Sequence, residues 1–173
     1  MRILVTGGVR SGKSRHAEGL LATRDHVRYV APGALPSEDD PEWAARVAAH
    51  QARRPSHWET VETRDVAAAI GLGGATLVDC LGTWLTATLD DVGAWTSEAD
   101  TWSRELADRI DAVATAVAAA DDVVLVTNEV GLGVVPAYAS GRLFRDLLGT
   151  LNQRVAAVCD EVHLVVAGRV LRL

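Results

Sequence analysis

The sequence predicts an α/β fold, with a mostly parallel sheet between two layers of helices. Two observations favour it: short continuous apolar runs alternate with longer stretches of helical periodicity, and the first run leads into a glycine-rich segment that opens a helical stretch. Continuous apolar runs are typical of strands that helices cover on both faces. With 173 residues, 49% of them hydrophobic, the chain is long enough for one core, so we expect a single domain over residues 1–173.

The expected strands are short apolar runs bounded by turn residues. They cover residues 3–6, 27–31, 75–80, 123–127 and 162–167. The last run is followed by Gly168-Arg169 and by a further apolar run at residues 170–173. This pattern predicts a two-residue hairpin turn and one antiparallel strand at the C-terminal edge of the sheet.

The expected helices are the longer periodic stretches between these strands. They cover residues 13–22, 42–54, 83–90, 98–120 and 138–159. In the last of them, Leu143, Leu147 and Leu151 recur at helical spacing, so one apolar face is expected to pack on the core.

The glycine-rich segment after the first expected strand is a complete G-x-x-x-x-G-K-[ST] motif. Its residues are Gly7, Gly8, Val9, Arg10, Ser11, Gly12, Lys13 and Ser14. Glycines allow successive backbone N–H groups to surround phosphate oxygens, Lys13 adds a positive charge, and the Ser14 hydroxyl is suited to Mg²⁺. An ordinary glycine-rich turn is the alternative, but a position between a buried strand and a helix favours a nucleoside triphosphate site. The sequence therefore predicts a three-layer sandwich of the RecA-like P-loop type, which binds a nucleotide.

Asp79 lies at the end of the expected strand at residues 75–80. P-loop folds place at this position an acid that holds Mg²⁺. We therefore expect Asp79 opposite Ser14, with both residues as ligands of the ion. The alternative is that Asp79 caps the helix that follows it.

A second group of candidate residues lies in the expected helix at residues 42–54. Arg46, Arg53 and Arg54 are three or four residues from His50, so we expect three guanidinium groups around one imidazole. Positive charge favours the neutral imidazole, which is the nucleophilic form, and arginines neutralise phosphate oxygens. The alternative is a solvated basic helix with an incidental histidine.

Composition and charge argue against several other classes of protein. A net charge of −6 and a pI near 5.3 are unlike a nucleic-acid-binding protein, which usually clusters excess Lys and Arg. Cys80 and Cys159 belong to no metal-binding spacing, so neither a zinc site nor a disulfide is indicated. No signal sequence or uncharged stretch of membrane-spanning length is evident. We expect a cytoplasmic protein with reduced thiols, no nucleic-acid partner and no stable membrane insertion.

Several motifs together resemble one enzyme family. Residues 7–14, 50–58, 79–81 and 127–131 occur in the order and at the spacing of the bifunctional adenosylcobinamide kinase/adenosylcobinamide-phosphate guanylyltransferases of cobalamin biosynthesis. The similarity extends from Arg2 to the C-terminal strand. Several motifs in register are much more specific than a phosphate loop alone.

This resemblance implies two reactions. The family phosphorylates the aminopropanol hydroxyl of adenosylcobinamide with ATP or GTP, and then transfers GMP from GTP to adenosylcobinamide phosphate, releasing pyrophosphate. A histidine of the family carries GMP covalently in the second reaction, and the matching position is His50. We therefore expect His50 and Lys13 to be catalytic residues. The family forms homotrimers, so part of the cobinamide site is expected between subunits.

The resemblance also implies the contacts to GTP. Besides residues 7–14, the matching positions are Ala31, Pro32, Gly33, Gln51, Ala52, Arg53, Arg54, Glu62 and Asp79. Glu62 as a contact to the base or ribose rests on the resemblance only. The family commonly has Ala-Thr where this chain has Ala31-Pro32. Proline lacks the threonine hydroxyl that could contact the nucleotide, so only backbone contacts are expected at this position.

Several alternatives stay open at this point. His57 competes for the covalent role, and Glu129 is either an acid on the substrate side or a loop cap. Trp84, Trp95 and Trp102 either contact a corrinoid or pack in the core. A different small-molecule P-loop kinase, or a nucleotide switch without a transferred product, would share the phosphate loop.

Overall fold

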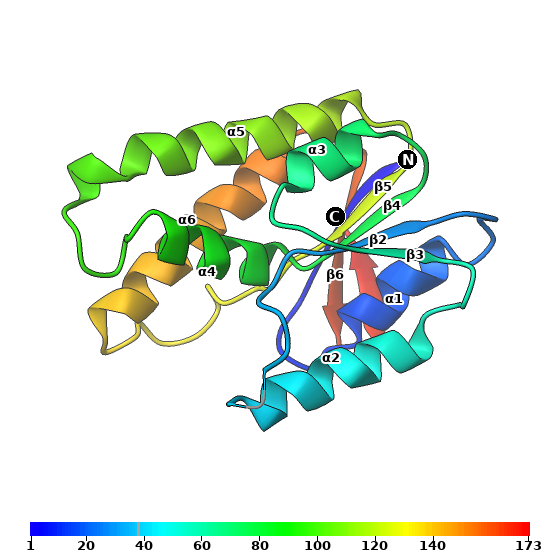
Figure 1. Ribbon diagram of the computed structural model, residues 1–173, viewed down its shortest axis with the longest axis horizontal. Helices are drawn as coiled ribbons and strands as arrows, with labels where there is room; N and C mark the ends of the chain where they lie inside the picture. The colour runs from blue at the N-terminus through cyan, green and yellow to red at the C-terminus, as the bar shows by residue number, and fades with distance from the viewer. Residues whose placement is uncertain (38) are drawn as a thin grey trace.

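A seven-stranded sheet forms the centre of the computed structural model, which describes residues 1–37 and 39–173 (Figure 1). Its strand order is β3-β2-β4-β5-β1-β6-β7. Neighbouring strands are parallel except β6 and β7, which form an antiparallel hairpin. The strands are β1 (Arg2–Thr6), β2 (Arg28–Ala31), β3 (Glu59–Glu62), β4 (Thr76–Asp79), β5 (Val123–Val126), β6 (Glu161–Val166) and β7 (Arg169–Arg172).

Helices cover both faces of this sheet. They are α1 (Lys13–Leu20), α2 (Pro41–Arg53), α3 (Val66–Gly71), α4 (Leu81–Asp91), the short 3₁₀ helix η1 (Ala99–Thr101), α5 (Ser103–Ala119) and α6 (Ala139–Ala156). In Figure 1, α3, α4, α5 and α6 lie on one side of the sheet, and α1 and α2 lie on the other. Across the described ranges, no helix combines the length and apolar character needed to cross a membrane.

Alternate residues of the central strands fill two hydrophobic cores, one on each face of the sheet. Leu4 and Leu125 belong to the core beneath α3, α5 and α6. Val5 and Val126 belong to the opposite core, where they pack with Ala17 of α1. Because successive side chains of a strand point to opposite faces, apolar residues are needed at consecutive positions, and the strands read as continuous apolar runs.

The predicted fold class is confirmed, because the sheet is parallel up to its antiparallel C-terminal edge and lies between two helical layers. Each expected strand and helix is present with its ends shifted slightly, and the expected helix at residues 98–120 is divided into η1 and α5. The prediction missed β3 and α3. The strand β3 has mostly exposed side chains and no apolar run, and α3 is only six residues long.

The C-terminal hairpin turn lies one residue earlier than predicted. Its two residues are Ala167 and Gly168, with φ of 49° and 74°, because Arg169 already pairs with Val166 in the ladder. Two consecutive residues with positive φ match the twist of the flanking strands. The predicted turn at Gly168-Arg169 is therefore wrong by one position.

The strand order brings the phosphate loop and Asp79 to the same edge of the sheet. The strands β1 and β4 lie on either side of β5, and both are parallel to it. The carboxyl end of β1 leads into residues 7–14, and the carboxyl end of β4 carries Asp79. These two ends therefore lie at the same edge of the sheet. Ligands of open α/β sheets bind at this edge.

Candidate active site

The phosphate loop between β1 and α1 is held in place by backbone contacts. Gly12 has a φ of 96°, a left-handed conformation that favours glycine. The backbone N–H of Gly168, in the β6–β7 turn, donates to the carbonyl of Ser11 at 2.8 Å. Lys13 Nζ donates to the carbonyl of Gly8 at 3.2 Å, so the ammonium lies over the loop. The C-terminal hairpin thus braces the loop.

Asp79 presents a buried carboxylate beside Ser14. Burial raises the pKa of this carboxyl, but the hydrogen bond and charge of His50, with hydrogen bonds from Tyr29 and Ser14, lower it more, so the net pKa lies below its ordinary value. Cys80, and not Asp79, occupies the N-cap position of α4, so the capping alternative is wrong. An ionised carboxylate next to a serine hydroxyl is a set of oxygen donors suited to Mg²⁺.

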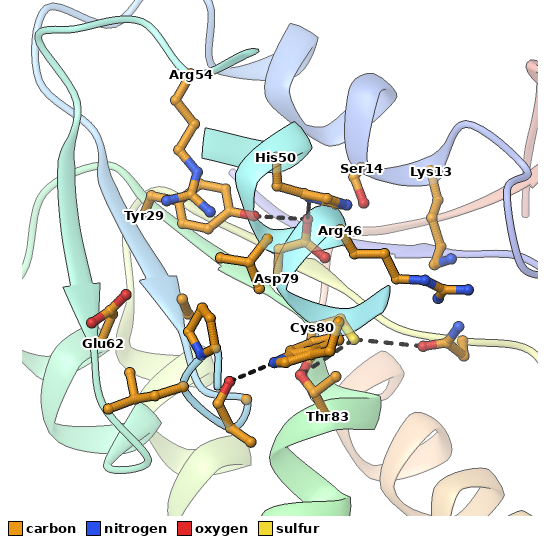
Figure 2. Close-up of a pocket in the computed structure, with 18 residues that line it drawn as sticks. Lys13, Ser14, Tyr29, Arg46, His50, Arg54, Glu62, Asp79, Cys80 and Thr83 are labelled. Carbon is orange, nitrogen blue, oxygen red and sulfur yellow. Dashed lines mark hydrogen bonds and ion pairs between the residues drawn. The ribbon is translucent and has the colours of Figure 1, made fainter. Parts of the chain in front are cut away.

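His50 reaches Asp79 from α2. Its Nδ1 lies 3.3 Å from Oδ2 of Asp79, and the hydroxyl of Tyr29 donates to the same oxygen at 2.9 Å (Figure 2). Tyr29 pairs in register with Leu77, and side chains two residues apart on a strand share a face. The sheet register therefore places Tyr29 and Asp79 on the face that α2 approaches.

The arginines near His50 line the same pockets as this histidine, in keeping with the predicted shared face. Each of them is held by another group, and the ion pair formed by His50 is with the carboxylate of Asp79. The prediction did not include this carboxylate, because helical spacing does not show which counterions other elements supply. The contacts are Arg46 Nη2 to Glu42 Oε1 at 3.1 Å, Arg53 Nη2 to Glu18 Oε1 at 3.2 Å, and Arg54 over the Tyr29 ring at 3.5 Å from its centroid.

Two adjoining pockets meet at His50. We call the first the inner pocket; residues lining it alone include Tyr29, Ala31, Gly33, Trp43, Val47, Arg54, Glu62, Asp79, Cys80 and Thr83. We call the second the loop pocket; residues lining it alone include Val9, Arg10, Ser11, Gly12, Arg15, Ala45, Ala49, Arg53 and Gly168. Both are lined by Lys13, Ser14, Arg46, His50 and Asn128. The shared residues therefore lie at the junction between the inner pocket, whose lining combines apolar and polar side chains, and the loop pocket.

The structure brings most of the predicted nucleotide contacts to these pockets. Ala31, Gly33, Arg54 and Glu62 line the inner pocket, and residues 9–14 and Arg53 line the loop pocket. The remaining predicted contacts line neither pocket: Gly7 and Pro32 are buried, Gly8 is exposed at the loop, and Gln51 and Ala52 are exposed on α2.

Sequence reasoning from the residues did not identify several side chains of the inner pocket. Tyr29, Trp43, Cys80, Thr83 and Asn128 line it, and among them Cys80 and Asn128 carried a usable signal. Cys80 follows β4 directly and Asn128 lies two residues after β5, at the edge where α/β proteins bind ligands. The others belong to elements that meet only in the folded chain.

The structure also decides some alternatives that the sequence left open. Glu129 Oε1 accepts a hydrogen bond from the backbone N–H of Gly131 at 2.6 Å, which supports the loop cap. Trp84 and Trp102 are buried in the core, so the corrinoid alternative is wrong for these two. His57 is exposed and does not line either pocket of the described chain.

Glu18 adds a third possible metal ligand to the site. One ligand atom each of Glu18, His50 and Asp79 lies within 4.8 Å of the others. Glu18 is already paired with Arg53, so a cation at this cluster would have to compete with a guanidinium. Ser14 and Asp79 are the simpler donor pair for Mg²⁺.

Comparisons with known proteins agree on one family. Residues 3–173 match the family model described as cobinamide kinase / cobinamide phosphate guanyltransferase. The chain is similar to the bifunctional adenosylcobalamin biosynthesis protein CobU of Salmonella typhimurium strain LT2, with 41% identity, and of Escherichia coli strain K12, with 42% identity; each alignment covers 97% of this chain and 97% of the relative. The bifunctional adenosylcobalamin biosynthesis protein CobP of Pseudomonas aeruginosa is 40% identical over 97% of this chain and 94% of its own.

Among solved structures, the P4 protein of bacteriophage φ6 in complex with ADP shows a distant likeness. It has a TM-score of 0.42 and 16% identity, and the match covers 97% of this chain and 53% of that chain.

Proposed function

The chain belongs to the cobinamide kinase / cobinamide phosphate guanyltransferase family, and on this premise we propose that it catalyses two successive reactions at one nucleotide site. It phosphorylates adenosylcobinamide with ATP or GTP. It then transfers GMP from GTP to adenosylcobinamide phosphate, giving adenosyl-GDP-cobinamide and pyrophosphate.

The position of His50 carries this proposal. His50 lines both the inner pocket and the loop pocket, so it lies at their junction. A nucleotide with its base and ribose in the inner pocket and its terminal phosphates on the phosphate loop has its α-phosphate at this junction. This position supports His50 as the nucleophile toward the α-phosphorus rather than the γ-phosphorus.

In the kinase reaction, the phosphate loop stabilises the charge on the transferred γ-phosphoryl group. Its backbone N–H groups and Lys13 act as preformed donors. The acceptor is the aminopropanol hydroxyl of cobinamide, and the diphosphate remains on the loop as the leaving group.

In the guanylyl transfer, neutral His50 is the nucleophile. A bond forms between an imidazole nitrogen and the α-phosphorus while the bond to the pyrophosphate oxygen breaks, and pyrophosphate leaves from the loop pocket. A phosphate oxygen of cobinamide phosphate then attacks the same phosphorus and displaces the imidazole. The second step restores His50 and forms the new phosphoanhydride bond.

Ser14 and Asp79 are the residues proposed to hold Mg²⁺. The donor chemistry fits, because the low pKa of Asp79 keeps its carboxylate ionised beside the Ser14 hydroxyl. When bound, Mg²⁺ supplies positive charge to the phosphate oxygens.

Contacts to the base and ribose are proposed in the inner pocket. Glu62 lies at the carboxyl end of β3 and lines this pocket. Its carboxylate accepts hydrogen bonds from guanine N–H groups or ribose hydroxyls. Near it, Ala31 and Gly33 offer backbone groups, and Arg54 offers a guanidinium.

We further propose that the protein acts in the cytoplasm as a homotrimer, on the basis of the family resemblance. Analytical ultracentrifugation of the purified chain tests the trimer: a species of three times the chain mass supports it, and a monomer at micromolar concentration contradicts it.

The decisive experiment is covalent labelling with α-labelled GTP and Mg²⁺. We expect label on the wild-type protein that is stable to base and labile to acid, as a phosphoramidate is, and no label on His50→Ala. His57→Ala is the matched control, because it removes an exposed imidazole that follows the same helix, and it should label normally. Normal labelling of His50→Ala would refute the assignment of His50 as the nucleophile.

Kinase activity separates the two reactions. His50→Ala should still transfer the γ-phosphoryl group of ATP to cobinamide, whereas Lys13→Ala should impair both reactions. A wild-type protein that phosphorylates cobinamide without ever carrying GMP would instead be a P-loop kinase only. Nucleotide binding with no transferred product would indicate a switch.

A further inference from the structure

One oxygen of Asp79 lies between two polar groups from different elements. The hydroxyl of Tyr29 donates to Oδ2 at 2.9 Å, and Nδ1 of His50 lies 3.3 Å from the same atom. Tyr29 is buried in the core, the Asp79 side chain is 7% exposed, and the His50 side chain is 34% exposed. A buried phenol therefore fixes the oxygen that faces the more accessible imidazole.

The direction of the hydrogen bonds follows from the chemistry of the carboxylate. Ionised Asp79 only accepts hydrogen bonds, so the hydrogen in its contact with His50 is on Nδ1. A neutral imidazole carries one N–H, and its Nε2 then has the free electron pair. Figure 2 shows that the far edge of the His50 ring is turned toward the side of the site where Ser14 and Lys13 lie.

We infer that Tyr29 is a positioning residue for guanylyl transfer: through Asp79 it holds His50 with Nδ1 protonated and presents Nε2 to the α-phosphorus. This inference rests on the proposed function. It adds a residue to the mechanism, because neither the sequence motifs nor the proposed nucleotide contacts assign a role to Tyr29.

The surroundings of Tyr29 fix its hydroxyl firmly. The tyrosine lies in β2, where it pairs with Thr60 of β3 and with Leu77 of β4. Arg54 covers the face of its ring and donates from Nη1 to Thr60 Oγ1 at 3.0 Å. The ring cannot rotate away without breaking these contacts, so the hydroxyl is a rigid donor to Asp79.

The two oxygens of Asp79 allow it to serve both reactions. Tyr29 and His50 both contact Oδ2, so neither of them uses Oδ1. Orientation of the imidazole and coordination of Mg²⁺ therefore do not compete for one atom. Loss of the Tyr29 hydroxyl should accordingly affect the guanylyl transfer more than the kinase reaction.

The test uses Tyr29→Phe, which removes one oxygen and keeps the ring beneath Arg54. Tyr138→Phe is the matched control, because it removes the same atom from a side chain on the surface. For each protein we would measure the single-turnover rate of labelling from α-labelled GTP, the rate of ATP-dependent phosphorylation of cobinamide, and the imidazole nitrogen NMR signals of His50.

For Tyr29→Phe, we expect labelling to slow by about tenfold, the effect of losing a hydrogen bond to a charged group. Cobinamide phosphorylation should change by less than about twofold. The NMR signals should shift from the tautomer with a proton on Nδ1 toward a mixture of both tautomers. Tyr138→Phe should match the wild type in all three measurements.

Three outcomes would overturn the inference: unchanged labelling in Tyr29→Phe, equal slowing of both reactions, or a wild-type His50 with its proton on Nε2. The last of these needs no variant and is independent of whether Tyr29→Phe folds. Failure of the wild type to label at all would instead refute the proposed covalent route. The nitrogen signals would still report whether Tyr29 and Asp79 select the tautomer.

Discussion

Glu18 and Arg53 form an ion pair that joins α1 to α2 beside the phosphate loop. Arg53 Nη2 lies 3.2 Å from Glu18 Oε1, and the Glu18 side chain is 12% exposed. Arg53 also lines the loop pocket. The guanidinium that we propose as a phosphate contact is therefore held by a protein carboxylate, and triphosphate binding has to compete with that carboxylate.

Glu18→Gln should strengthen nucleotide binding. The substitution removes the negative charge that holds Arg53 and that repels incoming phosphates, so the guanidinium becomes available to the ligand. We expect the Kd for GTP to fall about three- to fivefold, in line with the modest energy of partly exposed ion pairs. Isothermal titration calorimetry in the presence of Mg²⁺ measures the change.

Glu105→Gln is the matched control for this prediction. Glu105 pairs with Arg109 one turn along α5, its side chain is 57% exposed, and it lines neither the inner pocket nor the loop pocket of the described chain. Solvent screens such a pair, so the Kd should change less than about twofold. Weaker GTP binding by Glu18→Gln would show that the ion pair holds α2 in its binding position rather than competing with phosphate.

Gly7→Ala should damage the phosphate loop. A Cβ at this position would lie 2.4 Å from the backbone carbonyl oxygen of Val165 and 2.7 Å from Ser11 Oγ, and the backbone of β6 cannot move aside cheaply. We expect the free energy of unfolding to fall by about 1–3 kcal/mol, together with a loss of GTP affinity. Urea denaturation and calorimetric titration measure the two effects.

Gly19→Ala, in the helix α1 that follows the phosphate loop, should stabilise the fold instead. Gly19 is an exposed residue of α1, and a Cβ there meets no atom of the described chain within 4 Å. Because alanine favours a helix over glycine, we expect the free energy of unfolding to rise by about 0.5–1 kcal/mol. Equal destabilisation by both substitutions would contradict the crowding argument for Gly7.

The fold and the phosphate loop were predictable because their signals are contiguous in the sequence. Each central strand needs apolar residues on both faces, as Leu4 and Val5 illustrate, and the loop motif follows the first strand directly. In contrast, β3 lies at the edge of the sheet with mainly exposed side chains. A half-exposed edge strand does not need an apolar run, so its sequence resembles a loop.

The partners within the site were less predictable because they come from separate elements. Helical spacing correctly placed Arg46 and His50 beside the same pockets. It did not show that Asp79 would meet the imidazole or that Glu18 would hold Arg53. These contacts depend on how α2 docks against α1 and β4, which no local pattern encodes.

Leu125→Ala should strongly destabilise the fold. Leu125 is fully buried in β5, between its neighbours β4 and β1, so truncation leaves a cavity in the larger core. We expect the free energy of unfolding to fall by about 2–5 kcal/mol. Leu171→Ala removes the same atoms from an exposed position in β7 and should cost less than about 1 kcal/mol. Similar losses for the two variants in urea denaturation would contradict the assignment of the core.

Cys159 should react slowly with thiol reagents at neutral pH. Burial raises the pKa of its thiol to about 11; the charge of Asp160 acts in the same direction, and that of Arg2 opposes it. Because the thiolate is the reactive form, the rate of alkylation by iodoacetamide should increase with pH. The midpoint of this pH–rate curve should lie near the pKa of the thiol. Mass spectrometry of the peptide that contains Cys159 measures the rate. The unfolded chain in urea is the control, and its midpoint should lie at about 8.5.

The same pKa shift makes the stability of the fold depend on pH. Since the folded state holds this proton more tightly, the thiol stabilises the fold below the unfolded pKa and loses this contribution as pH rises toward 11. A native midpoint equal to that in urea would show that the thiol is solvated.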